Sequence, residues 1–278
     1  MKDIVVIYHG GCADGFSGAW AARKKFGSRA TYIGAFDRNV PSKGLRGKEI
    51  YLIDYTYKLP VIQKLIRENK RVTAIDHHVT AREAVMRTRD HSFDLKHSGA
   101  VLAWKYFHLG RLVPQFLRYV EDFDLWRFKL PQTRELMAFL DWHEQDFKVW
   151  DKLIRGFESA KTRRAYAEKG SLVLASQSRI QRDIIETGAE LVRFSGYRAY
   201  AVNSPVFISD IGHELAKRSR TLAIIWAAQR GAIRVSLRSS GKIDVAKIAE
   251  RYGGGGHKNA AGVILPEGTK LPWKRIKR

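Results

Sequence analysis

Residues 51–57 read YLIDYTY, and residues 72–80 read VTAIDHHVT. In both stretches a short apolar run ends on an acidic residue, Asp54 in the first and Asp76 in the second. Runs of this kind predict short buried β-strands. The second stretch adds a pair of histidines directly after its aspartate. Two neighbouring strands that end on carboxylates and imidazoles indicate a functional site at one edge of a sheet.

The first part of the chain alternates predicted strands with predicted helices. Strands that alternate with helices and are apolar on both faces are typical of a doubly wound, mainly parallel sheet of the α/β class. In such sheets, ligands bind beyond the carboxyl ends of the strands. His9, Asp54 and Asp76 would therefore lie together at that edge. The predicted strands are 3–8, 30–36, 50–54 and 71–76, and the predicted helices are 14–27 and 60–69.

The remainder of the chain divides into a helical region and a second region of strands. A long helix without proline is predicted from about 159 to 190, and strand patterns return from residue 191. We therefore expect an α/β domain with the site over 1–158, a connecting helix over 159–190 and a smaller α/β domain over 191–278. The helices predicted before the long one are 98–110, 113–122, 132–143 and 147–155.

The composition is that of a basic protein with a packed core. Of 278 residues, 45% are hydrophobic, and the single cysteine excludes an intramolecular disulfide. The start of the chain is not apolar enough for a signal peptide, and no apolar run approaches the roughly 20 residues of a membrane span. We expect a soluble, cytoplasmic protein with no membrane partner. The formal net charge of +22 favours a polyanionic partner, with nucleic acid as the leading candidate.

The polar residues at the predicted strand ends meet the needs of divalent cations. A single aspartate at a strand end is usually a turn or helix-cap residue, but here several potential ligands follow successive strands. Carboxylates bind hard cations and can bridge two of them, and imidazole favours manganese over magnesium. Two such ions can hold a phosphoryl group and activate water. The residues concerned are His9, Asp14, Asp54, Asp76, His77 and His78.

A second motif, RYGGGGHKNAAG, occupies residues 251–262. Consecutive glycines let backbone N–H groups approach an anion closely, and the histidine adds a donor. Arg238, near the end of a predicted strand, is a candidate for a bidentate contact with a phosphate. We expect this region to bind the substrate through Arg238, Gly254, Gly255, Gly256 and His257.

The two motifs together carry a resemblance to a known family. AIDHHVT resembles the defining motif of the DHH phosphoesterases, and GGGGHKNAAG resembles the signature of their DHH-associated C-terminal domain, DHHA1. The order and spacing match across nearly the whole chain. The family includes RecJ-like nucleases and oligoribonucleases that degrade very short RNA. The resemblance implies a DHH metal-binding catalytic domain over 1–158 and a DHHA1 substrate-binding domain over 191–278.

The resemblance also implies roles for the residues of the DHH motif and of the strand before it. Asp54 would bridge two metal ions, and His77 would ligate one of them. Asp76 would orient His77 from behind. His78 would face the scissile phosphate and, with Asp76, serve catalysis.

Two further motifs of the family would complete the metal ligands. The first matches HGGCADG through His9 and Asp14. The fourth is an aspartate after a helix, and VEDFDLW offers both Asp122 and Asp124. We prefer Asp122 because it directly follows the predicted helix, whereas Asp124 could cap the segment after it.

The chain departs from the family pattern at Cys12. The family has an aspartate two residues before Asp14, and the spacing from His9 is one residue shorter here. A neutral thiol cannot replace that charge. Cys12 is either a small buried turn residue, the interpretation that we prefer, or a sulfur ligand that joins His9 and Asp54 at the second ion. The expected cofactor is therefore Mn2+ at two sites, one of them weaker, with Mg2+ or Co2+ as possible substitutes.

The predicted function is metal-dependent hydrolysis of short oligonucleotides or related small nucleotides to mononucleotides. One alternative is a RecJ-like exonuclease on longer single-stranded DNA or RNA, which the net charge favours and the short chain disfavours. Another is a catalytically weak relative that binds nucleic acid. The sequence leaves open the cleavage polarity, the choice between RNA and DNA, adenosine bisphosphate or linear dinucleotides as substrates, and a homodimer.

Overall fold

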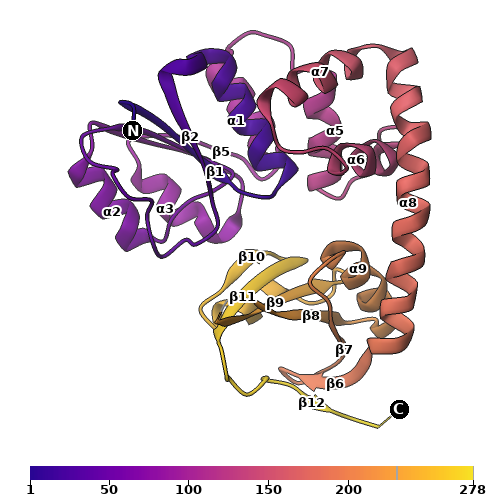
Figure 1. Ribbon diagram of the computed structural model, residues 1–278. Helices are drawn as coiled ribbons and strands as arrows, with labels where there is room; N and C mark the ends of the chain where they lie inside the picture. The colour runs from indigo at the N-terminus through magenta and orange to yellow at the C-terminus, as the bar shows by residue number, and fades with distance from the viewer. Residues whose placement is uncertain (230, 278) are drawn as a thin grey trace. The chain divides into compact units, whose positions relative to one another are not determined.

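The structure is a computed structural model, which describes residues 1–229 and 231–277 (Figure 1). The chain forms two compact units, Met1–Leu174 and Ala175–Arg278. Each unit contains its own sheet and hydrophobic core.

The sheet of the first unit has five strands, and all of its pairings are parallel. The strand order is β2-β1-β3-β4-β5. Because each strand alternates along the chain with at least one helix or a long crossover, the carboxyl ends of all five lie at one edge. The strands are β1 (Ile4–His9), β2 (Ala30–Ala35), β3 (Glu49–Ile53), β4 (Arg71–Asp76) and β5 (Asp90–Phe93).

Helices cover both faces of this sheet. On one face α1 (Ala13–Phe26) and α4 (Gly99–Phe107) pack side by side, and on the other lie α2 (Leu59–Glu68) and α3 (Arg82–Arg87) (Figure 1). The arrangement confirms the predicted doubly wound parallel sheet. Further helices extend the first face, and the last of them continues into the second unit. They are α5 (Gln115–Asp124), α6 (Thr133–Asp141), α7 (Phe147–Glu158) and α8 (Ala160–Gly188).

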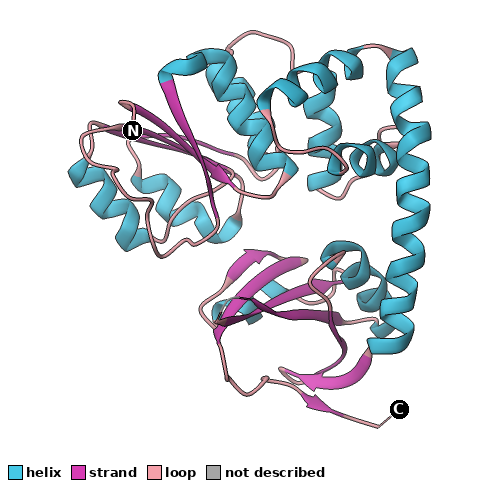
Figure 2. Ribbon diagram, viewed as in Figure 1, coloured by secondary structure: helices cyan, strands magenta, loops and turns pink. Residues whose placement is uncertain are grey.

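The second unit is a smaller α/β structure with a mixed sheet in the order β10-β11-β9-β8-β7-β6-β12 (Figure 2). Alternate residues of β8 face opposite sides, so that Ile224 packs under α10 (Val245–Glu250) and Ile225 packs under α9 (Ile208–Ser219). The strands are β6 (Glu190–Phe194), β7 (Tyr197–Asn203), β8 (Leu222–Gln229), β9 (Ala232–Ser239), β10 (Gly255–His257), β11 (Ala260–Pro266) and β12 (Lys274–Arg275).

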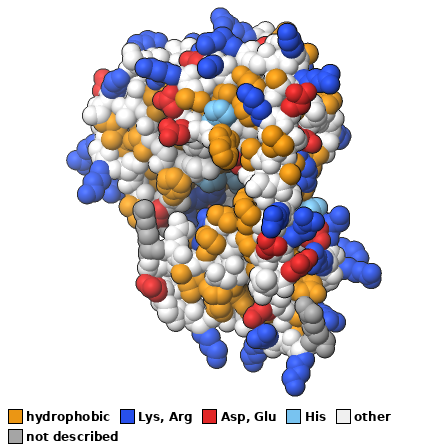
Figure 3. Space-filling view, turned by 45° about the vertical axis from the view of Figure 1, so that its right-hand side comes forward, with side chains coloured by type: hydrophobic (Ala, Val, Ile, Leu, Met, Phe, Trp, Pro, Cys, Tyr) orange, Lys and Arg blue, Asp and Glu red, His pale blue; other side chains and the backbone are white. Residues whose placement is uncertain are grey.

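The surface agrees with the charge of the sequence. On the face drawn in Figure 3, lysine and arginine side chains are more widespread than acidic ones. Among the described residues, no helix combines the length and the apolar character that a bilayer crossing requires.

Candidate metal centre

The parallel register brings three of the predicted site residues to one edge of the first sheet. Tyr8 of β1 pairs with Ile53 of β3, and Ile53 pairs with Ile75 of β4. The residues that follow these three, His9, Asp54 and Asp76, therefore emerge side by side. His9 and Asp76 are the last residues of β1 and β4, and Asp54 directly follows β3.

Asp54 is the central carboxylate of this cluster. Its Oδ1 lies 3.2 Å from His77 Nε2, and its Oδ2 lies 3.2 Å from His9 Nδ1. The side chain is 2% exposed, and the residue has a φ of 54°, in the left-handed region that favours glycine, asparagine and aspartate. Backbone strain of this kind persists only where surrounding contacts enforce it, and it is typical of functional sites.

One group of potential ligands surrounds the first carboxylate oxygen of Asp54. Asp14, His77 and Asp124 contribute ligand atoms that lie within 4.8 Å of one another. His77 Nε2 lies 3.9 Å from Asp14 Oδ2 and 3.6 Å from Asp124 Oδ2. Ligands bound at about 2.1 Å to an octahedral cation are themselves about 3 Å apart, so a small contraction would form a coordination shell.

A second group surrounds the other oxygen of Asp54. His9, Cys12 and Asp54 also offer ligand atoms within 4.8 Å of one another. Cys12 is the residue before α1, in extended conformation, and its side chain makes no capping hydrogen bond to that helix. The structure thus places the Cys12 sulfur where a ligand would lie, although the sequence led us to interpret it as a turn residue.

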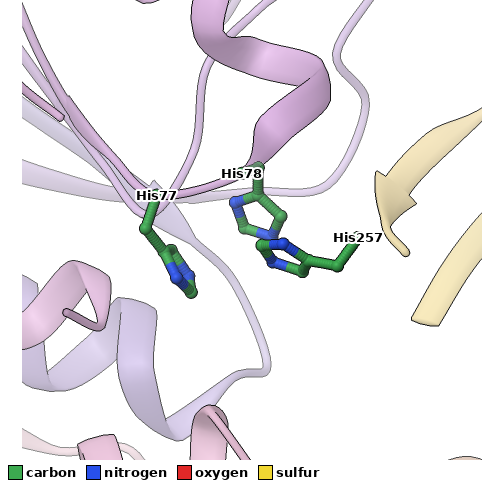
Figure 4. Close-up of side chains that lie close together, drawn as sticks. All are labelled: His77, His78 and His257. Atoms are coloured by element: carbon green, nitrogen blue, oxygen red, sulfur yellow. The ribbon is translucent and has the colours of Figure 1, made fainter. Parts of the chain in front are cut away.

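Asp76 and His78 form a separate, directed pair. The buried Asp76 carboxylate accepts hydrogen bonds from the backbone N–H groups of His77 and His78, at 2.7 and 2.9 Å, and from Thr56 Oγ1 at 2.7 Å. His78 Nδ1 lies 2.7 Å from the same carboxylate. Burial would raise the pKa of Asp76, but the charge of His78 and its hydrogen bond outweigh burial and hold this pKa well below its usual range. The carboxylate is therefore ionised, and His78 Nδ1 donates to it. Asp76 therefore orients the His78 ring and the backbone of His77, whereas we expected it to orient the His77 ring. The rings of His77 and His78 lie next to each other, with their centroids 4.7 Å apart (Figure 4).

The protonation of the metal-free cluster fits a site built for cations. Burial and the Asp54 charge raise the pKa of Asp14 to about 7, and burial with the Asp14 charge raises the pKa of Asp124 well above its usual range. Burial would lower the pKa of His77, but the hydrogen bond that it donates to Asp54 and the charges of the surrounding carboxylates raise it to about 10. Asp124 Oδ2 is buried and accepts no hydrogen bond from the described residues. A divalent cation would replace these protons and satisfy this oxygen.

These pKa values give a direction for metal affinity as a function of pH. A metal ion binds only an unprotonated imidazole, so below a pH of about 10 an ion that binds His77 must displace the proton of this histidine. Below a pH of about 7, metal binding also releases a proton from Asp14. We expect Mn2+ affinity to rise about tenfold per pH unit between pH 7 and 9, and more steeply below 7. Calorimetry in buffers of different ionisation enthalpy counts the released protons directly. An affinity that does not change with pH would contradict the protonation state described here.

Asp122, the ligand that we preferred from the sequence, does not belong to this group of potential ligands, and the structure favours Asp124 in its place. Its buried carboxylate accepts hydrogen bonds from Lys129 N at 2.9 Å, Leu130 N at 3.1 Å and Thr133 Oγ1 at 2.6 Å. It fixes the loop between α5 and α6. Because α5 continues to Asp124, two residues beyond the predicted end, the next aspartate is the one that faces His77.

The two aspartates should respond differently to substitution by asparagine. Asp122→Asn places an amide group against backbone donors and should lower the free energy of unfolding by about 1–3 kcal/mol, while leaving metal affinity close to that of the wild type. Asp124→Asn should leave the unfolding transition nearly unchanged and weaken Mn2+ binding and hydrolysis. Denaturant unfolding and metal titration of both variants measure the contrast. The opposite pattern would return the ligand role to Asp122.

Two of the predicted substrate-binding residues of the second unit, Arg238 and His257, lie in one row across the sheet. His257 of β10 pairs with Ala260 of β11, which pairs with Arg238 of β9. Directly paired residues point to the same face, so these side chains share a face about 10 Å apart. Arg238 donates to Ser209 Oγ and to Leu237 O, both at 3.0 Å, and burial lowers its pKa to about 10.

The glycines of the second motif have a structural function in addition to any contact with a ligand. A Cβ at Gly254 would lie 2.1 Å from Gly262 O, and a Cβ at Gly256 would lie 2.5 Å from Ala260 O. Both clashes are with the backbone of β11, so only glycine lets the two strands approach at this point. The motif therefore makes a hairpin rather than an open loop, and this hairpin presents His257.

Sequence reasoning missed Arg38, which lies on the loop after β2. Its guanidinium is 5.8 Å from the centre of the Tyr55 ring, and it acts with the larger effect of His78 to lower the pKa of Asp76. Lys58 N donates to Arg38 O at 3.0 Å and fixes this part of the loop. No local pattern distinguishes this arginine among the 50 basic residues of the chain.

Comparison with known proteins supports the family and the fold. The DHHA1 domain matches residues 207–273. An uncharacterized protein of Acanthamoeba polyphaga mimivirus is 29% identical over 98% of this chain and 70% of its own length. Oligoribonuclease NrnB of Bacillus subtilis is 40% identical, over only 24% of this chain and 17% of its own length. RecJ of Thermus thermophilus, solved in complex with Mn2+, shares the fold with a TM-score of 0.53 and 16% identity, over 95% of this chain and 49% of RecJ.

These matches support the resemblance to the DHH phosphoesterases that was inferred from the sequence. The chain contains a DHHA1 domain over residues 207–273 and carries the Asp76-His77-His78 motif.

Proposed function

We propose that the chain hydrolyses the phosphodiester bonds of short oligonucleotides, releasing mononucleotides, with Mn2+ as its cofactor. The observation that carries this proposal is Asp54, whose two oxygens face two separate groups of potential ligands. Asp14, Asp54, His77 and Asp124 would hold one ion, and His9, Asp54 and Cys12 the other. When bound, such a pair of ions polarises a phosphoryl group and activates water.

The remaining residues would bind and orient the substrate. His78, held through Nδ1 by Asp76, can present its other ring nitrogen to the scissile phosphate and stabilise charge that develops there. Asp76 acts as a positioning residue, because its carboxylate is occupied by protein donors. In the second unit, Arg238 and His257 would bind a phosphate of the substrate. The partly buried guanidinium of Arg238 makes its hydrogen bonds in the described contacts to neutral oxygens, and of the carboxylates only Asp210 acts on its pKa, so that it can accept an added anion.

The substrate class is tested by hydrolysis with Mn2+ of end-labelled RNA and DNA, from dinucleotides to long single strands. The proposal predicts that dinucleotides and other very short chains have the highest kcat/KM and yield mononucleotides. A kcat/KM that increases steadily with length would favour a RecJ-like exonuclease. Hydrolysis of adenosine bisphosphate alone would exclude an oligonucleotide substrate.

The Cys12 site gives a prediction about unequal metal affinities. The second site would have one carboxylate and a thiol, whereas the first would have three carboxylates when the shared Asp54 is counted with Asp14 and Asp124. Wild-type protein should therefore bind two Mn2+ ions with well-separated affinities. Cys12→Asp adds a hard, charged ligand and should tighten the weaker site by at least about tenfold. The manganese requirement for hydrolysis should fall in parallel. Calorimetric titration measures both affinities.

Cys12→Ser is the matched control for this substitution. Residue 12 is the N-cap of α1, where either serine or aspartate can accept a hydrogen bond from the first turn and stabilise the helix. Only aspartate adds charge. If serine tightened the weaker site as much as aspartate, helix capping would explain the effect and Cys12 would not be a ligand position.

A further inference from the structure

The first unit contains a groove at the edge of the sheet opposite the metal centre. Its cavity volume is about 970 Å3, and its lining includes Phe26, Trp104, Tyr106, Lys25, Arg71 and Arg111. We call it the amino-edge groove. Arg71 is the first residue of β4 and Asp76 is the last, so one strand length, roughly 20 Å, separates the groove from the metal centre. Helices α1 and α4 begin near the metal centre and end at the groove.

Two groups of aromatic rings line the groove. Trp20 and Trp104 stack with their centroids 5.6 Å apart and their planes 10° apart, and the His108 ring lies 4.2 Å from Trp104. On the other side, Phe26 lies 5.1 Å from Tyr51. The two tryptophans and Tyr51 are buried, whereas Phe26, Tyr106 and His108 are partly exposed. The buried rings thus fix the positions of the rings that a ligand can reach.

The charged residues of the lining are all basic. Lys24, Lys25, Arg71 and Arg111 line the groove together with His108, and the lining contains no aspartate or glutamate. Two carboxylates outside the lining offset part of this charge: Asp151 is 2.5 Å from Lys24 Nζ, and Asp90 forms an ion pair with Arg71. Lys25 and Arg111 are exposed, and no acidic partner is recorded for either among the described residues.

We propose that the amino-edge groove is a second binding site for single-stranded nucleic acid, which Lys25 and Arg111 hold by its phosphates and the exposed rings hold by its bases. Interleaved cations and aromatic rings are the combination that single strands require, because each nucleotide presents one negative charge and one planar face. An acidic segment of a protein would supply negative charge but no planar ring for each charge. It would therefore contact the basic residues of the lining and leave the exposed rings without a partner. The net charge of +22 would further attract such a ligand.

The choice of nucleic acid rests on the proposed function, but the groove adds a property that hydrolysis alone does not require. A dinucleotide in the metal centre is too short to reach the opposite edge of the sheet. A longer strand could bind in the groove without placing one of its phosphodiester bonds at the metal centre. The groove therefore predicts that the affinity for long strands exceeds that for dinucleotides, although dinucleotides have the higher kcat/KM.

The test compares the double variant Lys25→Ala/Arg111→Ala with Lys64→Ala/Arg67→Ala in the full-length chain. The control pair removes one lysine and one arginine, both exposed, from α2 on the other face of the sheet. Binding of a labelled single strand of about 20 nucleotides is measured by fluorescence anisotropy at several salt concentrations, with a chelator present to prevent hydrolysis. Dinucleotide hydrolysis with Mn2+ is measured separately on the same proteins.

The groove variant should bind the long strand about tenfold more weakly at low salt, and the slope of log affinity against log salt should become shallower by about 1.4, or 0.7 per lost phosphate contact. The α2 variant should bind like the wild type, and dinucleotide hydrolysis should be the same in all three. Equal losses in both variants, or no loss in the groove variant, would overturn the proposal. Because binding is measured without metal, an absence of hydrolysis would count against the proposed function and not against the groove.

Discussion

Asp54→Asn should abolish metal-dependent hydrolysis, with kcat/KM reduced on the order of a thousandfold or more. Loss of one electrostatic contact to a transition state commonly costs about 10²–10³ in rate, and Asp54 is placed to serve two metal ions at once. Its oxygens lie 3.2 Å from His77 Nε2 and 3.2 Å from His9 Nδ1, so both groups of ligands lose the carboxylate that they share. Both Mn2+ affinities should fall together.

Asparagine is the informative substitution because it preserves the local structure. Asp54 has a φ of 54°, which asparagine also adopts readily, and the two side chains have nearly the same shape. The unfolding transition should therefore change little while both metal sites weaken. Asp37→Asn, on the exposed loop after β2, makes the same chemical change outside the cluster and should leave hydrolysis and metal binding at wild-type values. Turnover in Asp54→Asn close to that of the wild type would exclude the shared-ligand assignment.

The elements that could be predicted from the sequence are those whose local pattern and tertiary environment agree. Strands β1, β3 and β4 are short apolar runs buried on both faces of a parallel sheet, and each begins and ends within about one residue of its predicted limits. Strand β5 is the exception. Its residues, DHSF, are mostly polar, and they become a strand because they pair with β4 at the edge of the sheet. That pairing depends on tertiary structure and has no local signal.

The candidate site shows the same division between local and tertiary information. The strand-end residues His9, Asp54 and His77 could be predicted because the ends of parallel strands converge. The choice between Asp122 and Asp124 could not be predicted, because it depends on the residue at which α5 ends. The ends of helices are predicted from sequence less reliably than the helices themselves. The contribution of Cys12 also depends on the path of the chain, since its sulfur meets Asp54 only after the turn into α1 forms.

Gly99→Ala is expected to disrupt the metal centre although residue 99 carries no ligand atom. A Cβ at this position would lie 2.5 Å from Asp54 Cβ, 2.9 Å from Asp14 Oδ2 and 3.0 Å from Asp54 Cα. Two of these atoms belong to the rigid part of Asp54, so rotation of a flexible side chain cannot relieve the clash. The backbone N–H of Gly99 also donates to Asp14 Oδ2 at 2.7 Å, so any shift of α4 moves a second carboxylate. Two of the four residues proposed to hold the first ion, Asp54 and Asp14, are thus displaced together.

Gly99→Ala should lower the free energy of unfolding, whereas a glycine-to-alanine substitution in a helix usually raises it. Glycine to alanine within a helix normally stabilises by roughly 0.5–1 kcal/mol, whereas overpacking here should cost about 1–3 kcal/mol. A misplacement of reacting groups by about 1 Å can lower the rate a hundredfold, and we expect a loss of at least that size in kcat/KM together with weaker Mn2+ binding. Gly188→Ala in α8 is the matched control, because its Cβ would meet only Val202 Cγ2, at 3.4 Å. If Gly99→Ala bound Mn2+ and turned over like this control, the close packing of α4 against Asp54 would not be what positions the metal ligands.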